Sequence, residues 1–208
     1  MQIIFFGGTF DPIHLGHLAI AKRVVERFPC SRILFAPSYI PPHKNFSALS
    51  PFPDRYRMTE LAISGMENLE VSDIEHEREK SSYTLDTLRI LRERFPGKTI
   101  SFLIGSDSLM QLHSWHECAS LVREFPVIVY PRSGVHPERE ELRKFWPEEE
   151  TEKLLSVVLK DVPLFPVSST SIKAMYRSGQ GAEAEKFLPE SVAAYIREHG
   201  LYRPETQA

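Results

Sequence analysis

The chain has few cysteines, and their arrangement excludes a disulfide-rich protein. Only two of its 208 residues are cysteine, Cys30 and Cys118, and they lie far apart with no CxxC pair. No disulfide framework can be derived from such a pattern. Two reduced thiols are typical of a protein that works in a reducing cytoplasm.

The chain also lacks an excess of positive charge and a long apolar run. It carries 25 Lys and Arg against 28 Asp and Glu, a net charge of −3, which argues against bulk binding to nucleic acid. A small basic pocket for a phosphorylated ligand remains compatible with this charge. No apolar run approaches the roughly 20 residues of a membrane helix, and the first residues lack the pattern of a secretory signal. We therefore expect a cytoplasmic protein with neither nucleic acid nor membrane as a partner.

What the chain does contain is an alternation of short apolar runs and helix-like segments. Runs rich in Ile, Val and Phe without polar alternation are typical of central parallel strands covered on both faces. The expected strands are Ile3–Phe6, Arg32–Ala36, Leu69–Ser72, Thr99–Ile104, Val127–Tyr130 and Val157–Leu159. The expected helices are Leu15–Phe28, Pro53–Ser64, Leu85–Phe95, Cys118–Phe125, Glu138–Phe145, Ser169–Arg177 and Pro189–His199. The alternation predicts an α/β fold, a doubly wound Rossmann-like parallel sheet with helices on both faces.

Length and segment composition favour one domain over residues 1–208, with a small helical C-terminal part from about residue 167. Pro37–Pro53 holds five of the 16 prolines and reads as a long irregular loop, which is often functional. Ser133–Lys153 is acid-rich, and a solvated helical face is its simplest interpretation. The sequence leaves the oligomeric state open, a homo-oligomer included.

The first expected strand runs into GGTFDPIHLGH, residues 7–17. Ligands of doubly wound sheets bind beyond the carboxyl ends of the strands, where Gly7, Gly8 and Thr9 fall. Glycines there let the backbone approach a ligand, and exposed N–H groups with a helix start can bind an anion. The stretch is neither GxGxxG nor a Walker loop, so the glycines alone are a weak signal.

Two histidines follow at a spacing of three, His14 and His17, with Gly16 between them. If a helix begins near His14, this spacing places both rings on one side, and Gly16 keeps that side open. The pair could bind phosphate, or one ring could cap the helix while the other packs. A zinc site would need a third ligand, and HExxH is absent. The residues themselves leave these interpretations open.

This stretch resembles the HxGH signature of the nucleotidyltransferase superfamily, and the full GGTFDPIHxGH pattern is most similar to the bacterial nicotinate-mononucleotide adenylyltransferases. The resemblance covers residues 3 to about 177. It implies a nucleotidyltransferase that joins the adenylyl group of ATP to nicotinate mononucleotide in NAD biosynthesis and releases pyrophosphate. It also implies Mg²⁺, carried mainly on the ATP phosphates and not on protein ligands.

Two further segments match motifs of that family. SYIPPHK, residues 38–44, carries His43 and Lys44 behind a stiff diproline, and the resemblance implies phosphate binding. SSYTLDTL, residues 81–88, would cap a helix by ordinary rules. The resemblance places this segment over the pyridine base, with Tyr83 and Thr84 near the nicotinate carboxylate and Ser82 among the contacts of the mononucleotide.

A third motif is GxDxLxxLxxW, within residues 105–115. Gly105 and Asp107 lie at the carboxyl end of an expected strand, where the carboxylate can accept a hydrogen bond from a ribose hydroxyl. Trp115 is either a core residue or a stacking face, and the resemblance implies that it packs on the pyridine ring. His113 stands where many relatives have Pro.

The last motif is VSSTSIK, residues 167–173. Ser168 to Thr170 precede an apolar helix and would cap it, and the resemblance to ISSTxIR implies that they grip the triphosphate. Lys173 replaces the usual Arg, keeping the charge without the bidentate fork.

Together these motifs predict a site with three groups of residues. We expect catalytic roles for His14, His17, Lys44 and Lys173. ATP should contact Gly7, Gly8, Thr9, Phe10, His14, Gly16, His17, Gly105, Asp107, Ser168, Ser169, Thr170 and Lys173. The mononucleotide should contact Gly8, Thr9, His43, Lys44, Ser82, Tyr83, Thr84 and Trp115. Two alternatives remain, another HxGH enzyme such as phosphopantetheine adenylyltransferase, or a nucleotide-binding α/β module without catalysis.

Overall fold

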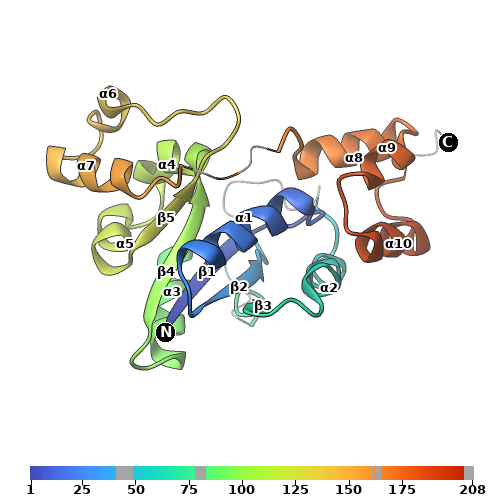
Figure 1. Ribbon diagram of the computed structural model, residues 1–208, viewed down its shortest axis with the longest axis horizontal. Coiled ribbons are helices and arrows are strands. Elements are labelled where there is room, and N and C mark those ends of the chain that lie inside the picture. Colours follow the sequence, from blue (N-terminus) through green and yellow to red (C-terminus); the bar gives the residue numbers. More distant parts are fainter. Residues whose placement is uncertain (41–48, 78–82, 161, 163–164, 204–208) are drawn as a thin grey trace.

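A five-stranded parallel sheet forms the centre of the computed structural model, which describes residues 1–40, 49–77, 83–160, 162 and 165–203. The strands lie in the order β3-β2-β1-β4-β5 (Figure 1). Their bounds are β1 Gln2–Gly8, β2 Ser31–Pro37, β3 Leu69–Val71, β4 Thr99–Gly105 and β5 Val127–Tyr130. The predicted Rossmann-like architecture is confirmed, and β1 lies at its centre with a neighbour on each side.

Side chains of β1 alternate between two separate cores, as the pleat of a strand requires. Ile4 and Phe6 enter one core, whereas Ile3 and Phe5 enter the other. All four are at most 3% exposed. A strand buried on both faces explains why this run contains no polar residue.

Each core is covered by its own set of helices, which contribute the buried apolar residues of that core. One face carries α1 Leu15–Arg27, α2 Phe52–Ile63, α8 Ser169–Arg177, α9 Gly181–Glu185 and α10 Glu190–His199. The other carries α3 Thr84–Arg94, α4 Ser106–Gln111, the short 3-10 helix η2 Leu112–Ser114, α5 Cys118–Glu124, α6 Arg139–Leu142 and α7 Glu148–Ser156. The predicted helices on both faces are therefore confirmed.

Two predicted elements differ from the structure. The expected strand Val157–Leu159 is wrong, because only Val158 pairs with Val129, as an isolated parallel bridge. Val157 is the C-cap of α7 and Lys160 is already exposed, so the chain meets the sheet edge for a single residue. The expected helix Glu138–Phe145 is shorter, since α6 spans only four residues.

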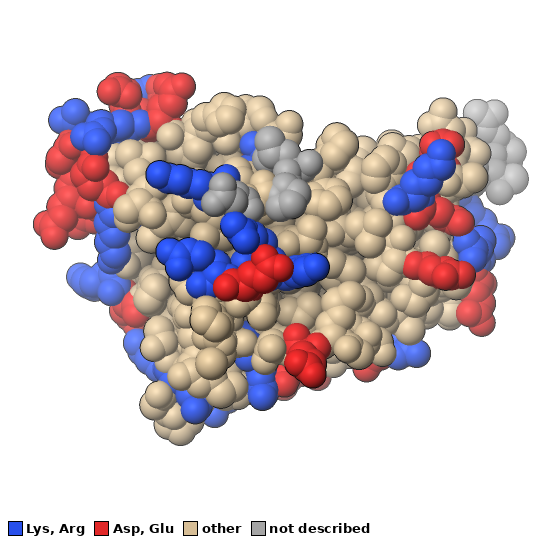
Figure 2. All heavy atoms as spheres, viewed as in Figure 1, with Lys and Arg blue, Asp and Glu red and all other residues tan. Residues whose placement is uncertain are grey.

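The acid-rich segment forms α6 and α7, joined through Pro147. Acidic and basic side chains are interspersed on the surface of these helices (Figure 2). Arg139 pairs with Glu148 and Glu152, and Arg143 also pairs with Glu148. The charged face is thus solvated as expected, while Leu142, Trp146 and Leu154 anchor the segment in the core.

The C-terminal helices are fastened to the loop that follows β1 at a buried carboxylate, Asp11, which is 1% exposed. The Lys173 ammonium donates to one carboxylate oxygen and the Tyr202 hydroxyl to the other, both at 2.6 Å. Beside them, the Ser169 hydroxyl donates to the Pro12 carbonyl at 2.9 Å. Burial raises the pKa of the Asp11 carboxyl, but the hydrogen bonds from Lys173 and Tyr202 outweigh it and hold the pKa below its usual value of 3.8.

Replacing Lys173 by Met should leave the buried Asp11 charge without its cation. Losing one partner of a buried ion pair costs about 3–5 kcal/mol. Denaturant unfolding at pH 7 should therefore show a free energy of unfolding that is lower by about that amount. Lys173→Arg should restore most of it. Because the pKa of Asp11 is lowered by folding, its contribution is present above about pH 4 and is lost as the pH falls through the folded value. As the pH is lowered, the difference in free energy of unfolding between the parent and the Lys173→Met protein should therefore shrink.

A matched control is Lys186→Met, which removes an exposed pair with Glu183 and should cost under about 1 kcal/mol. Equal stabilities for the Lys173→Met and Lys186→Met proteins would contradict the structural role of the Asp11 pair.

Candidate active site

Two adjoining cavities, of about 200 Å³ and 320 Å³, lie at the carboxyl ends of β1 and β4. They share a wall made of the ends of these strands and the first turns that follow. The shared residues are Gly7, Gly8, Leu103, Ile104, Ser108 and Trp115. A parallel sheet collects its strand ends at one edge, which is where a doubly wound fold binds ligands.

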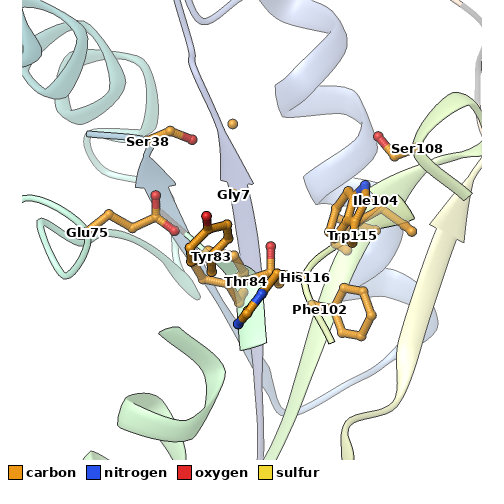
Figure 3. A pocket seen from close by; sticks show the side chains of 13 residues that line it. Gly7, Ser38, Glu75, Tyr83, Thr84, Phe102, Ile104, Ser108, Trp115 and His116 are labelled. Atoms are coloured by element: carbon orange, nitrogen blue, oxygen red, sulfur yellow. The ribbon is translucent and has the colours of Figure 1, made fainter. Parts of the chain in front are cut away.

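Aromatic side chains dominate the smaller cavity (Figure 3). Trp115 stands on one side of it and Tyr83 on the other. The ring of His116 lies 4.4 Å from that of Tyr83 at an angle of 30°. Thr84 begins α3 here, so the N–H groups of a helix start border an aromatic slot.

Polar groups dominate the larger cavity. His14, His17 and Arg132 line it together with the start of α8, Ser168 to Thr170. Ser168 caps that helix, since its hydroxyl accepts the Ser171 N–H at 3.1 Å. Helix starts and cations favour anions, so this half of the cleft is suited to phosphate.

The two histidine rings face each other with their centroids 3.8 Å apart. The backbone N–H of His14 donates to His17 Nδ1 at 3.2 Å, which leaves Nε2 as the N–H nitrogen of a neutral His17 ring. A Cβ on Gly16 would come within 2.9 Å of His14 Nδ1. A larger side chain at this position would therefore crowd the His14 ring, in agreement with the expectation that Gly16 keeps this side of the helix open.

His14 is only 5% exposed, and its Nδ1 has no hydrogen-bond partner among the described residues. Burial and, secondarily, the nearby Arg132 guanidinium lower the pKa of His14 to about 4. The ring is therefore neutral near pH 7, and it can form a hydrogen bond with a ligand without contributing a full charge.

Arg132 is the cation that the sequence motifs did not single out. Its Nε lies 3.5 Å from Asp107 Oδ1, and its guanidinium donates to the Tyr130 hydroxyl at 3.2 Å. It follows β5 at the carboxyl edge of the sheet, so the rule that ligands bind at strand ends could have found it.

Most of the predicted site residues line the two cavities. The larger contains Gly7, Gly8, Thr9, Phe10, His14, His17, Gly105, Asp107, Ser168, Ser169, Thr170 and Trp115. The smaller contains Gly7, Gly8, Tyr83, Thr84 and Trp115. Gly16 lines a small hollow beside the histidines.

Lys173 is placed differently, because it pairs with Asp11 and lines neither cavity. His43, Lys44 and Ser82 lie outside the described residues. Within the described part of the chain, no group of three or more His, Cys, Asp or Glu side chains could hold a metal ion. No helix in that part is long and apolar enough to cross a membrane.

Known proteins are similar to this chain in sequence and in fold. The model of the cytidylyltransferase-like family matches residues 5–175. A protein of Dehalococcoides mccartyi described as a probable nicotinate-nucleotide adenylyltransferase is 40% identical over 198 residues, covering 94% of each chain. The chain belongs to the family of nicotinate-nucleotide adenylyltransferases. Another such adenylyltransferase, from Neisseria meningitidis serogroup B, is 39% identical over 203 residues, 97% of this chain and 98% of the relative.

Solved structures of other proteins have the same fold as this adenylyltransferase. The nicotinic acid mononucleotide adenylyltransferase of Plasmodium falciparum, complexed with NaAD, superposes with a TM-score of 0.77 at 22% identity over 97% of both chains. The same enzyme complexed with APC superposes with a TM-score of 0.75 at 21% identity, over 97% of this chain and 96% of the other. At these identities the likeness concerns the fold.

His17→Ala should lower kcat by about 10²-fold or more, the scale for losing one preorganised donor to a transition state. Affinity for the substrates should change less. Steady-state kinetics test this, with His199→Ala as the control, because His199 is an exposed histidine packed on Tyr195 away from the cleft. A His17→Ala enzyme with near-parental kcat would remove the ring from the mechanism.

The His14 ring should titrate near pH 4 in the free protein, which NMR of labelled histidine can follow. Because burial is the larger cause of the lowered pKa, Arg132→Met should raise the midpoint only part of the way toward the usual value of 6.5. A parental midpoint near 6.5 would contradict this description of the site.

Proposed function

We propose that this protein transfers the adenylyl group of ATP to nicotinate mononucleotide, giving nicotinate adenine dinucleotide and pyrophosphate in NAD biosynthesis. The observation that carries the proposal is the division of one cleft into an aromatic half and a phosphate-binding half, with a common wall at β1 and β4. The pyridine ring would enter the half with Tyr83 and Trp115. The ATP phosphates would lie in the half with His14, His17 and Arg132.

The reaction needs no general base, because a mononucleotide phosphate is already an anion near neutral pH. One of its oxygens forms a bond to the α-phosphorus of ATP while the bond from that phosphorus to the bridging oxygen of the β-phosphate breaks. Pyrophosphate leaves with the electron pair. The work of the protein is then alignment and stabilisation of negative charge.

Each polar group of the larger cavity would have its part in that work. His17 Nε2–H and the neutral His14 ring would donate hydrogen bonds to the reacting phosphates, and Arg132 would supply full positive charge. The N–H groups at the start of α8, from Ser168 to Thr170, would bind the leaving pyrophosphate. Gly105, which has no side chain, would let the nucleoside of ATP approach closely, and Asp107 would accept a hydrogen bond from a hydroxyl of the ATP ribose.

Lys44, with His43, remains our candidate for the cation on the mononucleotide phosphate, and Ser82 for a contact to its base. Lys173 enters the proposal through Asp11, since its ammonium is 2.6 Å from that carboxylate. It would act by holding the start of α8 against the loop Gly7 to His14. Lys173→Ala should therefore lose much of the activity, and Lys173→Arg should keep most of it.

ATP would enter as its magnesium complex, with the metal on the β- and γ-phosphates. The described residues offer no cage of three or more acidic, His or Cys ligands. Magnesium would therefore be held mainly by ATP, where it would neutralise part of the phosphate charge.

Nicotinate mononucleotide should be preferred over the nicotinamide form. The N–H groups at the start of α3 favour a carboxylate, whereas an amide would bring N–H₂ donors against them. An unpaired buried polar group costs about 1–3 kcal/mol, so kcat/KM should differ by about one to two decades. Trp115 stacks on either ring alike, so Trp115→Ala should raise KM for both and leave their ratio similar.

Pyrophosphate release from ATP, with each mononucleotide offered separately, tests both the activity and this preference. Phosphopantetheine as acceptor is the control for a different HxGH enzyme. No turnover of either mononucleotide would refute the proposed function. Turnover without a preference for nicotinate would refute the role given to the start of α3.

A further inference from the structure

A buried carboxylate with no part in the motifs described above lies in the wall of the aromatic cavity. Glu75 belongs to the turn between β3 and α3, is 3% exposed and lines the cavity. Its carboxylate points toward Tyr83, on the side of the cavity opposite Trp115 (Figure 3). Buried carboxylates are costly, so this one calls for a structural or functional reason.

The contacts of Glu75 lead directly to the first turn of α3. Its Oε1 accepts the Thr87 hydroxyl at 3.2 Å, and Thr87 is fully buried. The same hydroxyl lies 3.2 Å from the carbonyl oxygen of Tyr83, which also accepts the Thr87 N–H at 3.2 Å. Tyr83 is the N-cap of α3. One short chain of contacts therefore connects the Glu75 carboxylate to the residue that starts the helix.

This connection bears on selectivity because a hydrogen bond to a ligand depends on direction as well as charge. The N–H groups that follow Tyr83 can meet a pyridine carboxylate only if the first turn of α3 is held in one position relative to Trp115. A helix end without tertiary contacts frays within its first turn. A buried hydrogen bond from the Thr87 hydroxyl to the Glu75 carboxyl oxygen is well suited to prevent that.

We propose that Glu75 is a positioning residue that sets the choice between nicotinate and nicotinamide mononucleotide, by holding the first turn of α3 through Thr87. The inference rests on the proposed function and deepens it. Glu75 acts on the substrate through the helix, so its loss should affect the mononucleotide and not ATP, whose phosphates lie in the other half of the cleft.

The test compares kcat/KM for the two mononucleotides in Glu75→Ala, Glu75→Gln and Thr87→Val. We expect the preference for nicotinate to fall by about tenfold in Glu75→Ala and in Thr87→Val, mainly through KM for nicotinate mononucleotide, with KM for ATP within about twofold of the parent. Glu75→Gln keeps an oxygen acceptor and should hold the ratio within about threefold. The double variant should be no worse than either single one, since both remove the same contact.

Thr151→Val is the matched control. Thr151 is equally buried, and its hydroxyl donates to the Trp146 carbonyl at 3.3 Å, in the acid-rich segment. Its replacement should cost stability and leave the ratio unchanged. If Glu75→Ala does not fold, Thr87→Val still removes the hydrogen bond while preserving the shape of the side chain.

Three results would overturn the inference. An unchanged ratio in Thr87→Val, with a loss of melting temperature like that of Thr151→Val, would show that the contact supports only the fold. A rise in the preference for nicotinate in Glu75→Gln would show that the carboxylate repels the substrate directly. Additive losses in the double variant would show that the two residues act separately. A parent enzyme inactive on nicotinate mononucleotide would instead overturn the proposed function.

Discussion

The buried carboxylate of Asp11 fastens together parts of the chain that lie far apart in the sequence. It belongs to the loop after the central strand, and it receives hydrogen bonds from Lys173 in α8 and from Tyr202 near the C-terminus. This junction, together with the hydrogen bond from the Ser169 hydroxyl to the Pro12 carbonyl, holds the loop Gly7 to His14 against the start of α8. Both line the larger cavity, whereas Asp11 itself lines neither cavity, so the phosphate half of the cleft depends on a charge that lies outside it.

The sheet supplies the second constraint. Parallel strands end at one edge, and β1 and β4 are neighbours, so their ends form a wall shared by two cavities of different chemistry. On one side aromatic rings stand beside the start of α3. On the other, two histidines and an arginine face the start of α8. Two phosphorylated substrates could thus meet end to end at the shared wall, which is the arrangement that an in-line transfer between them requires.

Sequence alone predicts the architecture and the local motifs well, because both depend on near neighbours. The apolar run of β1, the HLGH pair and the Ser168 cap can each be recognised from a few neighbouring residues. Contacts between residues far apart in the sequence cannot be predicted in this way. Lys173 occupies a motif position typical of a phosphate ligand, yet 162 residues separate it from the Asp11 carboxylate that it pairs with. Arg132 and Glu75 belong to no recognised motif, and only the folded sheet brings them to the cleft.

The central claim is that the two halves of the cleft hold different ends of one dinucleotide. A crystal structure of the protein with nicotinate adenine dinucleotide tests it most directly. We predict the pyridine ring between Tyr83 and Trp115, with its carboxylate at the start of α3, and the phosphates beside His14, His17 and Ser168 to Thr170. Adenine in the Trp115 slot, or phosphates remote from the histidines, would contradict the account.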